Sequence, residues 1–174
     1  MRRTAVLLLG LAIVGVLAVL SFTGDGSHAG GVATPTAFDL PALQGSGRVR
    51  LAAYRGRPVI VTLFASWCTA CEQELPTYAA AASALRGKAQ FIGVDSQETG
   101  DGPAFAARFR LAQSGFALAR DIGRASTGGM YTALGARGLP VTAFYSSTGS
   151  LLFKVEEGLT AAELHQMLKQ YYGL

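Results

Sequence analysis

The chain has 174 residues, enough for one ordinary domain with a terminal extension but short for a two-domain enzyme. Half of the residues are apolar and only 15% are charged, which excludes a disordered or low-complexity chain over most of its length. The net charge of +4 comes from scattered basic residues, so the sequence lacks the clustered basic footprint of a nucleic-acid-binding protein, and we expect no nucleic-acid partner.

The N-terminal segment has the composition of a membrane-directed sequence. Behind Arg2 and Arg3, residues 5–22 form an uncharged apolar run of 18 residues. A spanning helix needs about 17–25 such residues, whereas the apolar part of a cleavable signal has about 7–15. We therefore expect residues 1–22 to be a transmembrane anchor, with the rest of the chain on the extracytoplasmic side because the basic residues precede the run. Cleavage near Ala29 would instead give a secreted protein.

The remainder of the chain is predicted to be a tether followed by one α/β domain. Residues 23–34 are rich in glycine and form the expected tether, and the domain is placed at residues 35–174. An apolar β-branched run at residues 59–65 indicates a central strand that is covered on both faces. In chain order the expected elements are a hairpin (38–51), this central strand, a helix containing Pro76 (72–85), a strand (90–94), helices (103–111 and 126–134), a second hairpin (141–145 and 151–155) and a last helix (160–172) opened by a Thr160/Glu163 capping box.

A pair of cysteines lies where the central strand is expected to give way to a helix. The pair is Cys68-Thr69-Ala70-Cys71. The free N–H groups and the dipole at a helix N-terminus stabilise a thiolate, so Cys68 is the expected nucleophile. Cys71 lies one helical turn further on and is expected to resolve the mixed disulfide that Cys68 forms. A static disulfide or half of a metal site is the alternative interpretation.

The motif and its surroundings resemble a known family. Trp67 and the cysteine pair after VIVTLFAS resemble the thioredoxin superfamily, and CEQELP, FIGVDSQE and the segment LGARGLPVTAFYSSTGSLLFKVEEGLTAAEL are similar to TlpA/ResA-like thiol-disulfide oxidoreductases with a redoxin or AhpC/TSA-like domain. The resemblance covers residues 38–174. It implies a thioredoxin-like three-layer α/β/α sandwich with a mixed central sheet, an N-terminal hairpin extension and a helical insert. It also implies that the Cys68–Cys71 disulfide serves as redox centre without a further cofactor.

The resemblance also implies a substrate-binding surface beside the cysteines. Pro140 is expected to follow a cis peptide bond and to face the cysteine pair. Leu139, the residue before it, is expected to offer its backbone to the substrate. Trp67 is expected to contribute packing and motif geometry at the same surface, and Asp95 is expected to be a turn residue at a strand end.

Glu74 is the candidate proton acceptor. Thioredoxin itself has a buried aspartate in the central strand at the position of Thr62, and threonine cannot take the proton of the resolving thiol. Glu74 lies three residues after Cys71 and hence on the same helical face. Burial would raise its pKa and allow proton exchange with Cys71. The alternative is that Glu74, like Glu72, only complements the helix dipole.

These observations predict a membrane-anchored oxidoreductase that exchanges disulfides with extracytoplasmic proteins. The resemblance favours a reductant, in cytochrome c maturation or thiol repair, supplied with electrons by a membrane protein of the CcdA/DsbD type. A disulfide-forming oxidant remains an alternative, because the Thr69-Ala70 dipeptide does not reveal the direction. A Cu(I) carrier using both thiolates is a further alternative, with Met130 as the candidate additional ligand. A metal role is not expected for His28 or His165, and a thiol peroxidase would need a different cysteine motif.

Overall fold

The computed structural model describes residues 36–123 and 129–174. The expected anchor at residues 1–22 and tether at residues 23–34 lie outside these ranges, as does the start of the helix expected at residues 126–134. Within the two described ranges, no helix combines the length and the apolar character that are needed to cross a bilayer.

The centre of the molecule is a mixed sheet of five strands in the order β5-β4-β3-β6-β7. Strand β3 is the middle strand and is buried along its whole length, as predicted for the apolar run. It pairs in parallel with β4, which pairs in parallel with β5, and it pairs antiparallel with β6, which forms the predicted hairpin with β7. The strands are β3 (Val59–Phe64), β4 (Gln90–Asp95), β5 (Ala117–Arg120), β6 (Val141–Tyr145) and β7 (Leu151–Val155).

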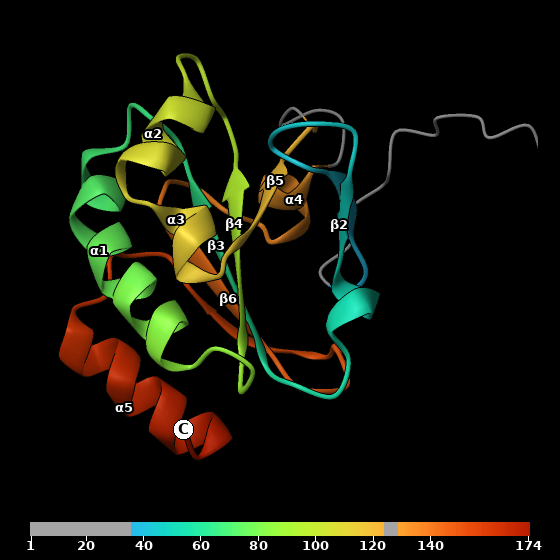
Figure 1. The fold of residues 1–174 in the computed structure, drawn as a ribbon, viewed down its shortest axis with the longest axis vertical. Helices are drawn as coiled ribbons and strands as arrows, with labels where there is room; N and C mark the ends of the chain where they lie inside the picture. The colour runs from blue at the N-terminus through green and yellow to red at the C-terminus, as the bar shows by residue number, and fades with distance from the viewer. Residues whose placement is uncertain (1–35, 124–128) are drawn as a thin grey trace, which may run out of the picture.

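Helices and a small hairpin cover the two faces of this sheet (Figure 1). Helices α1, α3 and α5 lie on one side in Figure 1, and the hairpin of β1 and β2 lies on the other. The arrangement is the predicted thioredoxin-like fold with its N-terminal hairpin extension. The bounds are β1 (Asp39–Pro41), β2 (Arg48–Arg50), the 3-10 helix η1 (Leu51–Tyr54), α1 (Thr69–Ala84), α2 (Gly102–Arg108), α3 (Leu111–Ser114), α4 (Met130–Ala133) and α5 (Ala161–Tyr172).

Two hydrophobic clusters hold the layers together, one on each face of the sheet. Alternate residues of β3 point to opposite faces. Ile60 and Phe64 therefore join the cluster beneath α1 and α5, whereas Val61 and Leu63 join the cluster beneath the β1–β2 hairpin. Because both faces are covered, the cysteine motif that follows β3 is anchored on a rigid base.

Helix α1 begins at Thr69, three residues before the expected start at residue 72, and two larger features also differ from the sequence-based prediction. The helix expected at residues 103–111 is divided into α2 and α3, because Arg110 adopts a left-handed backbone conformation (φ 54°) that an α-helix cannot accommodate. Strand β5 was not predicted. Its sequence, Ala-Leu-Ala-Arg, has weak β-propensity. The strand is held by residues that are distant in sequence: it pairs with β4, and Leu118 O accepts a hydrogen bond from Leu43 N (2.9 Å).

Candidate functional site

The two cysteines form a disulfide at the N-terminus of α1. Their Cα atoms are 5.2 Å apart. Cys68 is the N-cap residue, and its Sγ accepts a hydrogen bond from the backbone N–H of Cys71 (3.1 Å). The free backbone N–H groups at a helix N-terminus stabilise a negatively charged sulfur, and this contact is one such hydrogen bond. Cys68 thus has a backbone donor beside its sulfur, and its role as the nucleophile stays a prediction.

The two cysteines differ little in exposure in this disulfide form. Cys68 is 4% exposed and Cys71 is fully buried. Cys68 is thus more covered than a residue at the mouth of the site is expected to be, and its greater reactivity stays a prediction for the reduced form. The neighbouring Trp67 is 53% exposed, and its indole Nε1 donates a hydrogen bond to the backbone oxygen of Gln97 (2.8 Å).

Glu74 lies inside the molecule rather than on the outer face of α1. Only 3% of the residue is exposed. Its Oε1 accepts a hydrogen bond from the hydroxyl of Thr62 (3.2 Å), and its Oε2 accepts one from the backbone N–H of Leu159 (3.2 Å). The position at which thioredoxin has its aspartate is therefore occupied by a threonine that binds this glutamate. The sequence pointed to both residues but not to their contact with each other or with Leu159.

Burial changes the protonation of Glu74. Loss of solvent raises the pKa of this carboxyl to about 7, although the hydrogen bonds from Leu159 and Thr62 work in the opposite direction. Glu74 also lines a surface pocket of about 300 Å³, together with Gln73 and Gly158. A proton on the buried carboxyl consequently has a route to solvent. A carboxyl that titrates near neutral pH is suited to general acid–base catalysis.

Leu139 and Pro140 reach the same end of the sheet from another direction. The peptide bond between them is cis. Leu63 near the end of β3 pairs with Val141 at the start of β6. Pro140, which comes directly before Val141, therefore lies at the end of the sheet where the chain leaves β3 and enters the cysteine motif. Leu139 packs against both hydrophobic clusters, one of which contains the two cysteines. Leu139 and Pro140 thus share the end of the sheet with the disulfide, and their contact with substrate stays a prediction.

The candidate copper ligand is separated from the cysteines. Met130 is fully buried in the cluster beneath the β1–β2 hairpin, whereas Cys68 and Cys71 belong to the cluster on the opposite face of the sheet. In residues 36–123 and 129–174, no group of three or more His, Cys, Asp or Glu is arranged to hold a metal ion.

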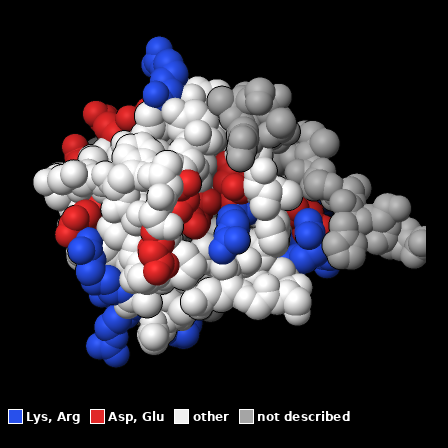
Figure 2. Space-filling model, turned by 90° about the horizontal axis from the view of Figure 1, so that it is seen from above, with Lys and Arg blue, Asp and Glu red and all other residues white. Residues whose placement is uncertain are grey.

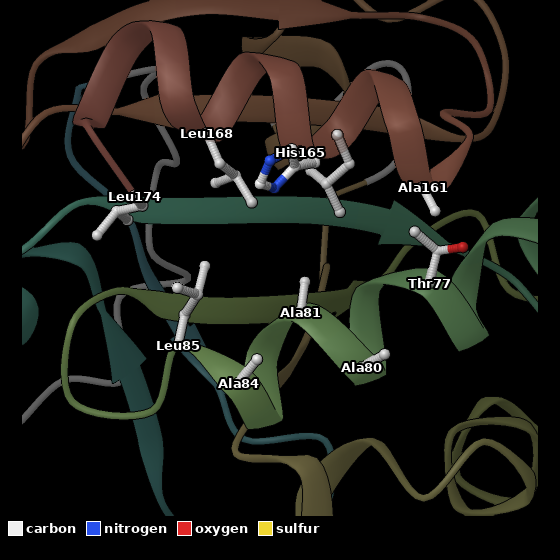
Figure 3. Close-up of a pocket in the computed structure, with 10 residues that line it drawn as sticks. Thr77, Ala80, Ala81, Ala84, Leu85, Ala161, His165, Leu168 and Leu174 are labelled. Carbon is white, nitrogen blue, oxygen red and sulfur yellow. The ribbon is translucent and has the colours of Figure 1, made fainter.

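An apolar groove of about 350 Å³ lies between α1 and α5, away from the cysteines. His165 of α5 and Ala81 of α1 lie on its opposite walls (Figure 3). Neither cysteine nor Glu74 lines it, although Thr77 lines both this groove and the Glu74 pocket.

A second polar cluster adjoins the site at the ends of β4 and β5. Asp95, expected to be a turn residue at a strand end, is the last residue of β4 and only 2% exposed. Glu98 follows it and accepts hydrogen bonds from the backbone N–H (2.7 Å) and the hydroxyl (2.6 Å) of Ser66. A hollow of about 470 Å³ is lined by four acidic side chains and one basic side chain, namely Asp95, Glu98, Asp101, Asp121 and Arg120, and acidic side chains gather in the middle of this face in Figure 2. Asp95 and Glu98 both belong to the segment FIGVDSQE, whose sequence gives no sign of the contact between Glu98 and Ser66.

Sequence comparisons relate the chain to thiol-dependent proteins. The profile of the AhpC/TSA family matches residues 31–151. Over 74 residues the chain is 35% identical to the thiol-disulfide oxidoreductase ResA of Geobacillus kaustophilus; this match covers 42% of the chain and 42% of that relative.

Solved structures of low sequence identity share the fold. The exposed lipoprotein thioredoxin of Streptococcus pneumoniae matches with a TM-score of 0.59 and 20% identity over 77% of this chain and 98% of its own. A protein described as the thiol:disulfide interchange protein DsbE of Chlorobium tepidum matches with a TM-score of 0.61 and 23% identity, over 80% of this chain and 96% of its own. A secreted disulfide oxidoreductase of Mycobacterium tuberculosis matches with a TM-score of 0.61 and 18% identity, over 78% of this chain and 97% of its own.

Proposed function

This chain belongs to the AhpC/TSA family, and we propose that it is a thiol-disulfide oxidoreductase of the thioredoxin superfamily that works as a reductant of protein disulfides. The observation that carries disulfide exchange is the buried Glu74 on the same helical face as Cys71, with a pKa near 7, while the reductant direction rests on the family resemblance. Such a carboxyl can take the proton that a resolving thiol must lose before it attacks.

The reaction proceeds in two exchange steps. The Cys68 thiolate attacks one sulfur of a substrate disulfide, which forms a mixed disulfide and releases the first substrate thiolate. Glu74 then accepts the proton of the Cys71 thiol, and the Cys71 thiolate attacks the Cys68 sulfur. This step releases the second substrate thiolate and forms the Cys68–Cys71 disulfide. Two electrons have passed from the protein to the substrate, and the proton on Glu74 leaves toward solvent or a departing thiolate.

The substrate surface is assigned to the residues around the disulfide. Leu139 would present its backbone to an extended substrate segment, with Pro140 holding that backbone in place beside the cysteines. Trp67 would supply an exposed apolar surface next to Cys68. Support for these assignments comes from the register of β3 and β6 and from the exposure of the indole.

The site of action is proposed to be the extracytoplasmic side. The apolar run at residues 5–22 behind two arginines supports an anchored chain facing outward. Two of the structural relatives are described as an exposed lipoprotein and as a secreted protein. The oxidised form would be reduced again by a membrane dithiol protein of the CcdA/DsbD type, and the substrates would be disulfides in cytochrome c maturation or in thiol repair.

Reduction of insulin by the full-length protein tests the proposal. With dithiothreitol as electron source, we expect catalysed reduction that is lost in Cys68→Ser. A protein that oxidises reduced substrates but does not accelerate insulin reduction would instead be the disulfide-forming alternative. Tight Cu(I) binding without disulfide exchange would indicate the carrier, although the position of Met130 gives that alternative no additional ligand near the thiolates.

A further inference from the structure

We propose that Glu98 is a positioning residue for the redox site: its carboxylate fixes the Ser66–Trp67 segment and thereby holds the Trp67 indole at the entrance to Cys68. The proposal arises from four hydrogen bonds that converge on one side chain. The part of the proposal that concerns substrate affinity rests on the function proposed above.

The contacts of Glu98 join two segments that are far apart in sequence. Its Oε2 accepts the backbone N–H of Ser66 (2.7 Å), and its Oε1 accepts the hydroxyl of Ser66 (2.6 Å). The same Oε1 accepts the backbone N–H groups of Thr99 (2.8 Å) and Gly100 (2.6 Å). One carboxylate therefore links its own loop to the residue two positions before Cys68. Hydrogen bonds to an ionised acceptor are stronger than neutral ones.

The ionisation of Glu98 is consistent with this role. Burial alone would raise the pKa of Glu98, but the hydrogen bonds from Ser66 and Gly100 outweigh it and hold the pKa at about 2. Asp95 lies beside it, and burial together with the Glu98 carboxylate raises the pKa of Asp95 to about 7. Near pH 6, Glu98 is therefore an ionised hydrogen-bond acceptor, whereas Asp95 is mostly protonated and neutral.

The backbone around Glu98 is shaped to this contact. Gln97 has a left-handed conformation (φ 56°), which is uncommon for a residue with a side chain. This conformation accompanies the bond from the Trp67 indole to the Gln97 backbone oxygen (2.8 Å). A Cβ at Gly100 would lie 2.7 Å from the Ser66 hydroxyl, closer than Cβ atoms approach, so a side chain there would displace that hydroxyl.

These contacts give Trp67 a fixed orientation despite its exposure. Trp67 is 53% exposed, yet two hydrogen bonds restrain it. Its indole Nε1 donates to the backbone oxygen of Gln97, and the backbone N–H of the preceding residue, Ser66, donates to Glu98. A rigid half-exposed aromatic ring binds a partner at low entropic cost. We therefore assign Glu98 a role in substrate affinity, exerted through Trp67 and not by contact with the reacting sulfurs.

Fluorescence tests this role directly, because Trp67 is the only tryptophan of the chain. In full-length protein in detergent, Glu98→Gln should increase acrylamide quenching of Trp67 and lower its anisotropy, because the amide that replaces the carboxylate would place N–H groups against the donors. With insulin as substrate, kcat/KM should fall about tenfold, mostly through KM, as expected when a charge-assisted contact is lost. Gly100→Ala should change both readouts in the same direction.

The matched control is Glu72→Gln, which removes a half-exposed carboxylate of α1 that pairs with Arg108 (2.7 Å). It should leave quenching and KM as in the wild type. Wild-type quenching and KM in both Glu98→Gln and Gly100→Ala would overturn the proposal. If Glu98→Gln does not fold, Ser66→Ala decides, since it removes only the hydroxyl contact: raised quenching supports the role and unchanged quenching refutes it. If even the wild type fails to reduce insulin, the proposed function fails, while quenching still decides the role of Glu98.

Discussion

Glu74 is held between the central strand and the loop before α5, with one hydrogen bond from each. The two donors are neutral, so they stabilise the carboxylate less than burial destabilises it, and the pKa rises to about 7. The charge of Glu74 also adds to burial in raising the pKa of Tyr78, whose hydroxyl shares a hydrogen bond with Thr142 (2.9 Å). Tyr78 therefore stays neutral, whereas Glu74 changes protonation near pH 7.

Glu74→Gln should keep the fold and slow disulfide exchange. The change preserves the size of the side chain and removes its titration, and loss of a general acid–base group slows a reaction by about 10²–10⁴-fold. The step affected is resolution by Cys71, so the mixed disulfide should persist longer. Stopped-flow reduction of a model disulfide across pH measures both the rate and the pH profile. An unchanged rate and profile would return Glu74 to the role of a helix-dipole acid.

Cys71→Ser should trap mixed disulfides with substrate proteins, whereas Cys68→Ser should trap none. The reason is the position of Cys68 as N-cap of α1, with its sulfur beside the N–H of Cys71. Non-reducing electrophoresis of the two variants after incubation with a disulfide substrate distinguishes them. Trapping by Cys68→Ser would invert the assignment of nucleophile and resolving thiol.

At the scale of elements, the capping box of α5 supports the site. Thr160 Oγ1 accepts the backbone N–H of Glu163 (3.3 Å), and Glu163 accepts the backbone N–H of Thr160 (2.9 Å). The residue before the cap is Leu159, whose N–H is bound to Glu74. The start of α5 and the buried carboxyl are thus connected through one short loop.

Thr160→Ala should destabilise the protein by about 1 kcal/mol, the usual effect of losing an N-cap hydroxyl. Thr160→Ser keeps the hydroxyl and should retain most of the stability. Urea unfolding monitored by circular dichroism measures both variants. Equal stability of the alanine variant and the wild type would show that the box contributes nothing to folding.

Sequence patterns predicted the elements whose signals are local. The apolar run of β3, the β6–β7 hairpin and the capping box all appear as expected. Strand β5 and the break at Arg110 were missed, because the first depends on pairing with β4 and the second on a single backbone conformation. The resemblance pointed to Glu74 and Pro140. The hydrogen bonds of Glu98 to Ser66 join residues 32 positions apart, and only the fold brings them together.

For the molecule as a whole, stability should fall as pH rises from about 5 to 8. The pKa values of Glu74 and Asp95 are raised to about 7, so the native state binds more protons than the unfolded state between about pH 4 and 7. Stability is then fully present below that interval and is lost as pH rises through it. The pKa of Glu98, at about 2, lies outside this range.

Urea unfolding at pH 5 and pH 8 isolates the part due to Glu74. The loss between these pH values should be smaller in Glu74→Gln than in the wild type, by on the order of 2–3 kcal/mol for a pKa raised to about 7. The loss due to Asp95 remains in both proteins and cancels in the comparison. An identical pH dependence in the two proteins would show that Glu74 ionises freely in the folded state.

The midpoint potential of the Cys68–Cys71 couple tests the central claim most directly. Reductants and oxidants with this fold differ in potential, from about −270 mV for thioredoxin to about −120 mV for DsbA. Equilibration of the full-length protein with dithiothreitol or glutathione redox buffers, followed by alkylation of the free thiols, gives the value. A reductant of protein disulfides should have a potential below about −200 mV. A potential near −120 mV would contradict this account and identify the protein as a disulfide-forming oxidant.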